Sequence, residues 1–365
     1  MRTLKSLERA AKAATTRVIA ASLRNAARGE RPDWRTREHR VLFLRHDRIG
    51  DMILSTGILR AIAAASPTIR LDVLASPINA PVLRAESYVN EVLVFDRHQP
   101  LTYPSAAMRL RARRYDAVID CMITAPSTTT LLLMLASGAR HRIGVRQGND
   151  FAYTLALPPR ESAVHIVDKL GALVTAFGLE PSGIDLRPRI TLTADERAAG
   201  ESAWLSGAPV ATRRVRLLVN VSAGKAFRQW TDDRFVDVVN AVRARGPLDV
   251  LVIGAPNEWP RTARIAAASE ARAARTPAVR DAFALVAASD VVFTPDTSIG
   301  HAATAFGKPA TVMFIRDMAS LWGPYASGGR SIESPSPDLE PISADTAAAS
   351  LTVLVDAARA RLAGR

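Results

Sequence analysis

Apolar residues alternate between short runs of strand length and longer stretches with helical spacing, beginning near residue 41. Residues 41–46 form the first apolar run, and residues 53–65 then repeat apolar positions every three to four residues. The same order recurs down the first half of the chain. It predicts further strands at 71–76, 91–96 and 115–121, and further helices at 77–86, 105–114, 128–138 and 165–181. This alternation is typical of a parallel sheet with helices on both faces.

Residues 179–213 interrupt this pattern with proline, glycine and polar residues, and we interpret them as a connection leading into a helix at 194–206. A second alternating block then begins. Its predicted strands are 215–224, 248–255, 290–296 and 309–315, and its predicted helices are 232–245, 260–271, 281–289, 299–307 and 344–362. No short-period repeat is present.

The two blocks predict an α/β protein with two Rossmann-like, doubly wound domains that face each other across a cleft. The expected divisions are a basic extension at 1–40, domains at 41–180 and 214–335, a linker region at 181–213 and a tail at 336–365. Ligands of such folds bind beyond the carboxyl ends of the strands. With two facing domains, this rule places the expected site in the cleft between them.

The charge is concentrated at the N-terminus. Of the net charge of +13, residues 1–40 carry +7, from eleven basic and four acidic residues. Small and apolar residues at helical spacing there favour a weak interfacial helix that touches an anionic membrane; the alternative is a solvated extension. The segment lacks the uninterrupted apolar core of a secretory signal, and no run reaches membrane-spanning length.

The single cysteine, Cys121, excludes an internal disulfide framework and a multi-cysteine metal site, and it favours a reducing compartment. We therefore expect a cytoplasmic protein, with contact at the inner face of the inner membrane as the role of residues 1–40.

The first chemical motif is RHDRIGDM at residues 45–52, between a strand and a helix. Gly50 suits the turn, and Asp51 stands where a helix start favours negative charge. The alternative for Asp51 is a simple helix cap. Arg45 and Arg48 could meet acceptor phosphates or only support the loop. No GxGxxG is present, which argues against a dinucleotide redox cofactor.

The second motif is NVSAGKAFRQW at residues 220–230. Small residues and two cations in one turn can hold a diphosphate, although the Walker A spacing is absent. The candidates are Ser222, Ala223, Lys225 and Arg228. The alternative is an exposed basic turn.

The third motif follows a strand within residues 293–314, where a turn opens a helix of small residues that can approach a phosphate. Its candidates are Asp296, Thr297, Ser298, Gly300 and His301. A lone histidine is more often structural, but its neighbours here favour a functional one. Glu258 follows the strand 248–255, where a carboxylate can bind a ribose diol.

Four segments in order carry a family resemblance: RHDRIGDMILSTGILRAI, HIVDKLGALVTAFGL, DVVFTPDTSIGHAATAFGKPATVMF and SLWGPYASGGRSI. They resemble the heptosyltransferase family, glycosyltransferase family 9, from residue 41 to about residue 330. The resemblance implies a GT-B fold, a donor nucleotide sugar on the C-terminal domain and a lipid saccharide acceptor on the N-terminal one. It also implies inverting transfer without a metal ion or another cofactor.

The resemblance also implies roles for individual residues. Asp51 would be the general base, and Glu258 would bind the ribose. Phosphate binding would fall to Ser222, Ala223 and Arg228, and the donor loop would comprise Asp296, Thr297 and Gly300 with His301 in support. The sequence departs from the family pattern at FIRDMASL, which places Arg316 and Asp317 next to the expected donor site.

We therefore expect ADP-heptose as donor and an anionic lipopolysaccharide-core or lipid-linked saccharide as acceptor. Two alternatives remain at this stage: a relative that uses another nucleotide sugar for capsule or another glycan, and a non-catalytic nucleotide or nucleic-acid binder. An aromatic content of 5% and the absence of a nucleic-acid motif argue against nucleic acid.

Overall fold

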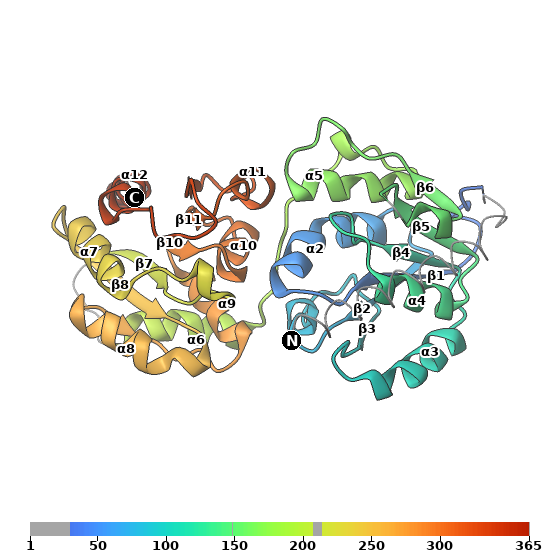
Figure 1. Cartoon of the computed structure of the whole chain (residues 1–365), viewed down its shortest axis with the longest axis horizontal. Coiled ribbons are helices and arrows are strands. Elements are labelled where there is room, and N and C mark those ends of the chain that lie inside the picture. The colour runs from blue at the N-terminus through green and yellow to red at the C-terminus, as the bar shows by residue number, and fades with distance from the viewer. Residues whose placement is uncertain (1–29, 148, 207–213, 365) are drawn as a thin grey trace. The chain divides into compact units, whose positions relative to one another are not determined.

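The computed structural model describes residues 30–147, 149–206 and 214–364. The chain divides into two compact units, one ending at Leu186 and the other beginning at Arg187 (Figure 1). The helix expected near the N-terminus falls on residues 1–29, which lie outside the described residues. None of the described helices is both long and apolar enough to cross a bilayer.

The described part of the first unit contains a six-stranded parallel sheet in the order β3-β2-β1-β4-β5-β6. Its strands are β1 (His39–Arg45), β2 (Ile69–Ala75), β3 (Glu91–Val94), β4 (Ala117–Asp120), β5 (His141–Val145) and β6 (Leu155–Leu157). The strand order reverses between β1 and β4. Central strands are buried on both faces, which explains their almost continuous apolar sequences.

Helices cover both faces of this sheet. They are α2 (Ile49–Ala64), α3 (Tyr103–Ala112), α4 (Thr128–Ser137) and α5 (Ile166–Leu170), with 3₁₀ turns η1 (Ala80–Leu83), η2 (Pro100–Thr102), η3 (Asp150–Ala152), η4 (Gly171–Phe177) and η5 (Pro181–Gly183). The pair α3 and α4 packs over the face that carries Leu42 and Leu44, and α2 packs with α5.

The described part of the second unit repeats this topology, with the order β12-β11-β10-β7-β8-β9 and all pairs parallel. Its strands are β7 (Val215–Asn220), β8 (Leu248–Ile253), β9 (Arg272–Ala273), β10 (Val291–Pro295), β11 (Ala310–Phe314) and β12 (Arg330–Glu333). Here the order reverses between β7 and β10. Two doubly wound α/β units confirm the predicted fold class.

The helices of the second unit complete its two outer layers. They are α6 (Ala194–Leu205), α7 (Asp232–Arg243), α8 (Trp259–Ala268), α9 (Val279–Ala288), α10 (Ser298–Ala305), α11 (Ala319–Trp322) and α12 (Ala344–Ala363), with 3₁₀ turns η6 (Ala226–Arg228) and η7 (Pro256–Glu258). A capping box starts α6, in which Thr193 and Glu196 satisfy each other's backbone amides.

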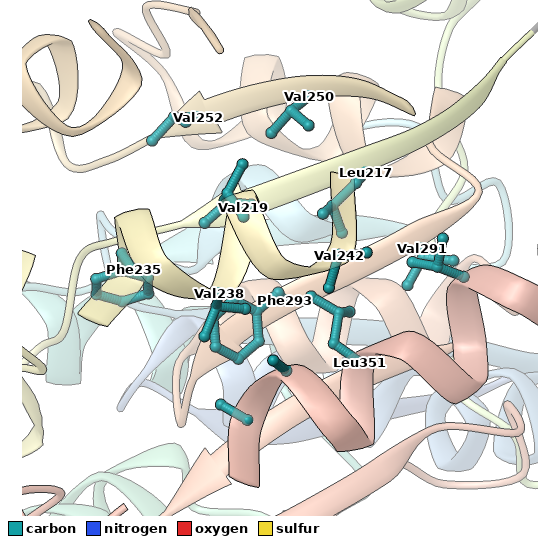
Figure 2. Packing of buried hydrophobic residues seen from close by; sticks show 14 of the residues in the cluster. Leu217, Val219, Phe235, Val238, Val242, Val250, Val252, Val291, Phe293 and Leu351 are labelled. Carbon is teal, nitrogen blue, oxygen red and sulfur yellow. The ribbon is translucent and has the colours of Figure 1, made fainter. Parts of the chain in front are cut away.

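The core of the second unit lies between its sheet and the helices α7 and α12. Figure 2 shows Phe235 and Val238 of α7 and Leu351 of α12 directed at the strand residues Val219 and Phe293. All five of these side chains are fully buried. Burying side chains of this size contributes roughly 1.5–3 kcal/mol each, so this layer holds the helices α7 and α12 against the sheet.

Several sequence predictions need correction. The helix expected at 77–86 is only the 3₁₀ turn Ala80–Leu83, where a proline lies in the first turn. The helix expected at 165–181 becomes 3₁₀ after Leu170 and ends at Gly178 in the left-handed conformation.

Four strands and a short helix are present that the sequence pattern did not predict: β5, β6, β9, β12 and α11. These strands are short or polar; β6, β9 and β12 lie at a sheet edge, and β5 lies next to one. Pairing with a neighbouring strand defines them more than their own hydrophobic pattern does.

Candidate functional site

In the first unit, the loop after β1 is held in place by the buried amide of Asn79. Its Oδ1 accepts a hydrogen bond from the Ser76 amide at 2.8 Å, and its Nδ2 donates to the carbonyls of Arg45 at 3.0 Å and Arg48 at 3.4 Å. This contact ties the loop after β1 to the loop after β2. Asn79 was not among the predicted site residues, since a single asparagine in a loop gives no distinctive pattern.

Asp51 lies in the first turn of α2 and is partly exposed. The N-cap position belongs to Arg48, which makes no side-chain capping bond and is exposed. Gly50 is buried beside Asp51. The amides of a helix N-terminus favour the charged form of a carboxylate placed there, so this position suits an ionised Asp51.

Arg45 is only 3% exposed, and its guanidinium is occupied within the protein. Nε donates to Ser55 Oγ at 2.9 Å, and Nη1 pairs with Asp47 Oδ2 at 3.1 Å. Burial by itself would lower the pKa of Arg45, but the nearby carboxylates of Asp47 and Asp51 more than offset it, and the pKa is raised. Arg45 therefore acts here as an internal cation beneath the loop. Its burial argues against the direct acceptor contact considered from the sequence.

His46 and Asp120 lie at the carboxyl ends of the neighbouring central strands β1 and β4, and both are buried. His46 Nε2 is 3.1 Å from Thr130 Oγ1, and burial lowers the pKa of His46 to about 4. Asp120 Oδ2 accepts a hydrogen bond from the Tyr153 hydroxyl at 2.8 Å, and burial raises the pKa of Asp120. These groups support the loops where the strand order reverses.

In the second unit, Asn220 joins the loops that follow β7 and β10. Its side chain is nearly buried, and Nδ2 lies 2.9 Å from Thr294 Oγ1, 3.2 Å from Thr297 Oγ1 and 3.2 Å from the Ser222 carbonyl. Asn220 was not among the predicted site residues. Its position at the end of a predicted strand, directly before a polar loop, is the sequence feature that could have identified it.

Arg228, in the loop after β7, and Asp296, directly after β10, form an ion pair. Arg228 Nη1 lies 2.6 Å from Asp296 Oδ2, with side-chain exposures of 20% and 8%. Arg228 Nε is also buried and has no hydrogen-bond partner among the described residues. The contact holds a cation beside the start of α10. Lys225, in the same loop, is exposed.

Ser222 and Glu258 bind the neighbouring loops together. Ser222 Oγ accepts a hydrogen bond from the Ala255 amide, and Ala223 is partly exposed next to it. Glu258 Oε1 accepts from Gln229 Nε2 at 3.0 Å and lies 3.7 Å from Arg261 Nη1. The predicted residues of the loops after β7, β8 and β10 are thus connected through side-chain contacts.

The start of α10 supplies the remaining predicted residues. Thr297 is its N-cap, with Oγ1 accepting from the Ile299 amide at 3.3 Å, and Ser298 is partly exposed. A Cβ on Gly300 would lie 3.1 Å from Val312 Cγ2, so this glycine lets the helix approach β11 closely. His301 is 8% exposed, and its ring centroid lies 6.4 Å from that of Trp322.

Arg261 braces the loop of residues 221–230 and was missed by the sequence analysis. Its guanidinium donates to the carbonyls of Val221 at 2.6 Å and Trp230 at 2.7 Å, and to Asp232 Oδ1 at 2.7 Å. An arginine on an amphipathic helix has no pattern that distinguishes such a role from simple solvent exposure.

The family model for glycosyltransferase family 9 (heptosyltransferase) matches residues 105–341. The chain belongs to glycosyltransferase family 9. It is 22% identical over 297 residues to lipopolysaccharide heptosyltransferase 3 of Escherichia coli, covering 76% of this chain and 84% of that protein. The resemblance that the four sequence segments carry is thereby confirmed, and the chain is a heptosyltransferase-like glycosyltransferase.

Solved structures from this family share the fold. A family 9 glycosyltransferase from Veillonella parvula is 16% identical, with a TM-score of 0.75, and the match covers 88% of this chain and 98% of that one. ADP-heptose lipopolysaccharide heptosyltransferase II of E. coli is 19% identical, with a TM-score of 0.68, and coverages of 88% and 99%. The chain therefore has the GT-B fold.

Substituting Asn220 tests whether its amide holds the second-unit loops together. Asn220→Ala leaves the hydroxyls of Thr294 and Thr297 without this donor, and we expect a loss of about 1–3 kcal/mol in unfolding free energy. The exposed Asn240→Ala is the control, with an expected change within about 0.5 kcal/mol. Urea denaturation measures both. Equal stability of the two variants would show that the loops do not depend on Asn220.

His46 predicts a pH dependence of stability in the first unit. Its folded pKa of about 4 lies below its ordinary value of 6.5, so the unfolded chain binds the proton more readily between these values. Unfolding free energy is expected to fall as the pH drops from 6.5 to 4, by about 3 kcal/mol from this residue.

Thermal unfolding measured across this pH range tests the prediction. His46→Gln should flatten the dependence, whereas His98→Gln, which replaces an exposed histidine of the same unit, should retain it. The same pH slope in wild type and His46→Gln would contradict the assignment.

Proposed function

We propose that this chain is an inverting, metal-independent glycosyltransferase that moves heptose from ADP-heptose onto a lipopolysaccharide core or a related anionic glycan. The observation that carries this proposal is the Arg228–Asp296 pair beside the N-terminus of α10. The guanidinium of Arg228 lies next to the start of α10, at the carboxyl ends of β7 and β10, between which the strand order reverses. A helix N-terminus and such a reversal point both favour binding of a phosphate group.

The donor diphosphate would bind where the loops after β7 and β10 meet. Arg228 and Lys225 supply positive charge, and Ser222, Thr297 and Ser298 supply hydroxyls or amides. The buried N–H at Arg228 Nε has no acceptor among the described residues, so a nearby anion would offer it a partner. Charge that develops on the departing nucleoside diphosphate is stabilised by these groups, and the step needs no metal.

Glu258 is the proposed ligand of the ribose hydroxyls. It lies in η7, the turn after β8, which is the strand next to β7, and Gln229 and Arg261 hold its carboxylate in place. A carboxylate at this position of a doubly wound unit accepts hydrogen bonds from a ribose diol. The nucleotide would then extend from the β8 loop to the start of α10.

Asp51 is the proposed general base. Its position in the first turn of α2 and the buried positive charge of Arg45 both favour the ionised carboxylate. An ionised carboxylate can take the proton from the acceptor hydroxyl as the oxygen attacks C1 of the sugar. The diphosphate leaves from the opposite side, so a single displacement inverts the anomeric centre. Gly50 and the exposed Arg48 would adjoin the acceptor.

The ligands of similar proteins support the proposal that ADP-heptose is the donor. Structures of E. coli heptosyltransferase WaaC are described with ADP and with ADP-2-deoxy-2-fluoro heptose, and these share the fold with TM-scores of 0.64 and 0.65. A second candidate is transfer of another nucleotide-linked sugar. It is favoured by Arg316 and Asp317, which are exposed directly beyond the carboxyl end of β11. In either case we place the reaction at the inner face of the inner membrane, with residues 1–40 as a basic contact and no nucleic-acid partner.

Two substitutions separate the proposed base from the proposed phosphate ligand. Asp51→Asn should reduce transfer from ADP-heptose to a heptose-deficient lipopolysaccharide by about 10²–10⁴-fold, with unchanged affinity for ADP. Arg228→Gln should weaken ADP binding by about 10–100-fold through loss of a charge-assisted contact. Mass spectrometry of products and calorimetry with ADP measure the two effects.

Asp345→Asn is the matched control for Asp51, because it removes an exposed carboxylate from the first turn of α12. Full turnover by Asp51→Asn would remove Asp51 as the base. Wild-type binding of ADP without transfer of any nucleotide sugar would favour a non-catalytic binder. Transfer from a different nucleotide sugar alone would favour the second candidate.

A further inference from the structure

The segment from residue 97 to residue 114 on the first unit is unusually basic. It contains Arg97, Arg109, Arg111, Arg113 and Arg114 and no aspartate or glutamate. Arg113 pairs with Glu91 at 2.5 Å, while the other four arginines are exposed. The segment includes η2 and the whole of α3, which packs on α4 at the outside of the unit (Figure 1).

The same segment carries the two most exposed large apolar side chains in the described part of the chain. Leu101 is 95% exposed and Met108 is 67% exposed. Single exposed apolar residues are common on proteins and need no special explanation. Leu101 and Met108 differ because they are only seven positions apart, on a helix and the turn that leads directly into it.

The buried side of α3 shows which face of the helix points outward. Ala106 and Leu110 are buried and belong to the core cluster beneath the helix. With 3.6 residues per turn, Met108 projects nearly opposite to them, with Pro104, Arg111 and Ala112 around it. The outward face of α3 therefore has Met108 at its centre and the exposed Arg109 and Arg111 at its border, where the Arg111 guanidinium also lies against Gly138 at the end of α4.

This combination matches the surface of an anionic lipid bilayer. Apolar side chains enter the boundary between headgroups and acyl chains, while arginines remain with the phosphates. A nucleic acid would also attract the arginines, but it would offer no apolar layer for Leu101 and Met108. We propose that the outward face of η2 and α3, residues 101–114, docks this enzyme on a membrane containing anionic phospholipid.

Aromatic contacts connect the inner side of α3, beneath the docking face, to the loop that carries the proposed base. The ring centroid of Tyr103 in α3 lies 5.0 Å from that of Phe95, and Phe95 lies 5.6 Å from His46. The start of α3 thus lies near the end of β1. For an acceptor embedded in a membrane, docking through this face would bring the bilayer to the acceptor-binding side of the unit. Only this consequence depends on the proposed function.

Vesicle sedimentation of the full chain tests the proposal without any sugar substrate. Wild type should bind vesicles of equimolar phosphatidylcholine and phosphatidylglycerol, and bind phosphatidylcholine alone much less. Each arginine near an anionic surface strengthens binding by roughly fivefold. The triple variant Arg109→Gln, Arg111→Gln, Arg114→Gln should therefore lose roughly 100-fold in partitioning. Leu101→Ser with Met108→Ser should lose about tenfold or more.

Matched controls come from exposed residues of the second unit. Arg245→Gln, Arg330→Gln and Arg361→Gln remove the same charge, and Leu205→Ser with Val353→Ser replaces side chains that are 64% and 50% exposed. Both controls should bind as wild type does. Unfolding free energy should change by no more than about 1 kcal/mol in each of the four variants, because every altered side chain is exposed and exposed ion pairs contribute little.

Three outcomes would overturn the proposal. One is wild-type binding by both α3 variants, which would place the membrane contact elsewhere, for example in residues 1–40. Another is equal loss in the α3 and control variants, which would reveal an effect of net charge alone. The third is binding of single-stranded RNA in preference to vesicles, lost in the arginine variant but kept in Leu101→Ser with Met108→Ser.

Discussion

Each unit of this protein depends on one topological constraint, the reversal of strand order in a parallel sheet. In the first unit the connections from β1 and β4 leave toward opposite faces, and in the second unit those from β7 and β10 do the same. The loops at these points diverge, so the carboxyl ends of the strands are left open for side chains and ligands. Because the rest of each sheet is buried between helices, the polar side chains with candidate roles lie at these carboxyl ends.

Buried polar groups at the carboxyl ends of the strands need hydrogen-bond partners. This requirement explains why several side chains bridge the loops there. Asn79 in the first unit and Asn220 in the second each bridge two loops through one buried amide. Arg261 performs a comparable task with its guanidinium. An unsatisfied buried donor or acceptor costs about 1–3 kcal/mol, so breaking these contacts is unfavourable and they stabilise the loops that carry the proposed ligand groups.

The two units place charge differently, which suits the different tasks proposed for them. In the first, Arg45 is buried beneath the loop and paired with Asp47, so its positive charge acts through the protein on Asp51. In the second, Arg228 is partly exposed beside the start of α10, where it pairs with Asp296 and where we propose that a phosphate binds. The arginines around α3 are exposed and border an apolar face, an arrangement suited to a surface rather than to a small ligand.

The sequence by itself determined the alternation of strands and helices, the α/β class and the family, since long periodic segments and four ordered motifs depend on local residue patterns. It also named Asp51, Arg228 and Asp296 as members of loops at strand ends. Only the tertiary structure decided that Arg45 is buried, that Arg228 pairs with Asp296 and that Asn220 joins two loops. It also decided the edge strands β6, β9 and β12, whose short sequences become strands through pairing with a neighbour. Periodicity reports which side of an element faces the core, whereas the partner of a polar side chain depends on residues far away in the chain.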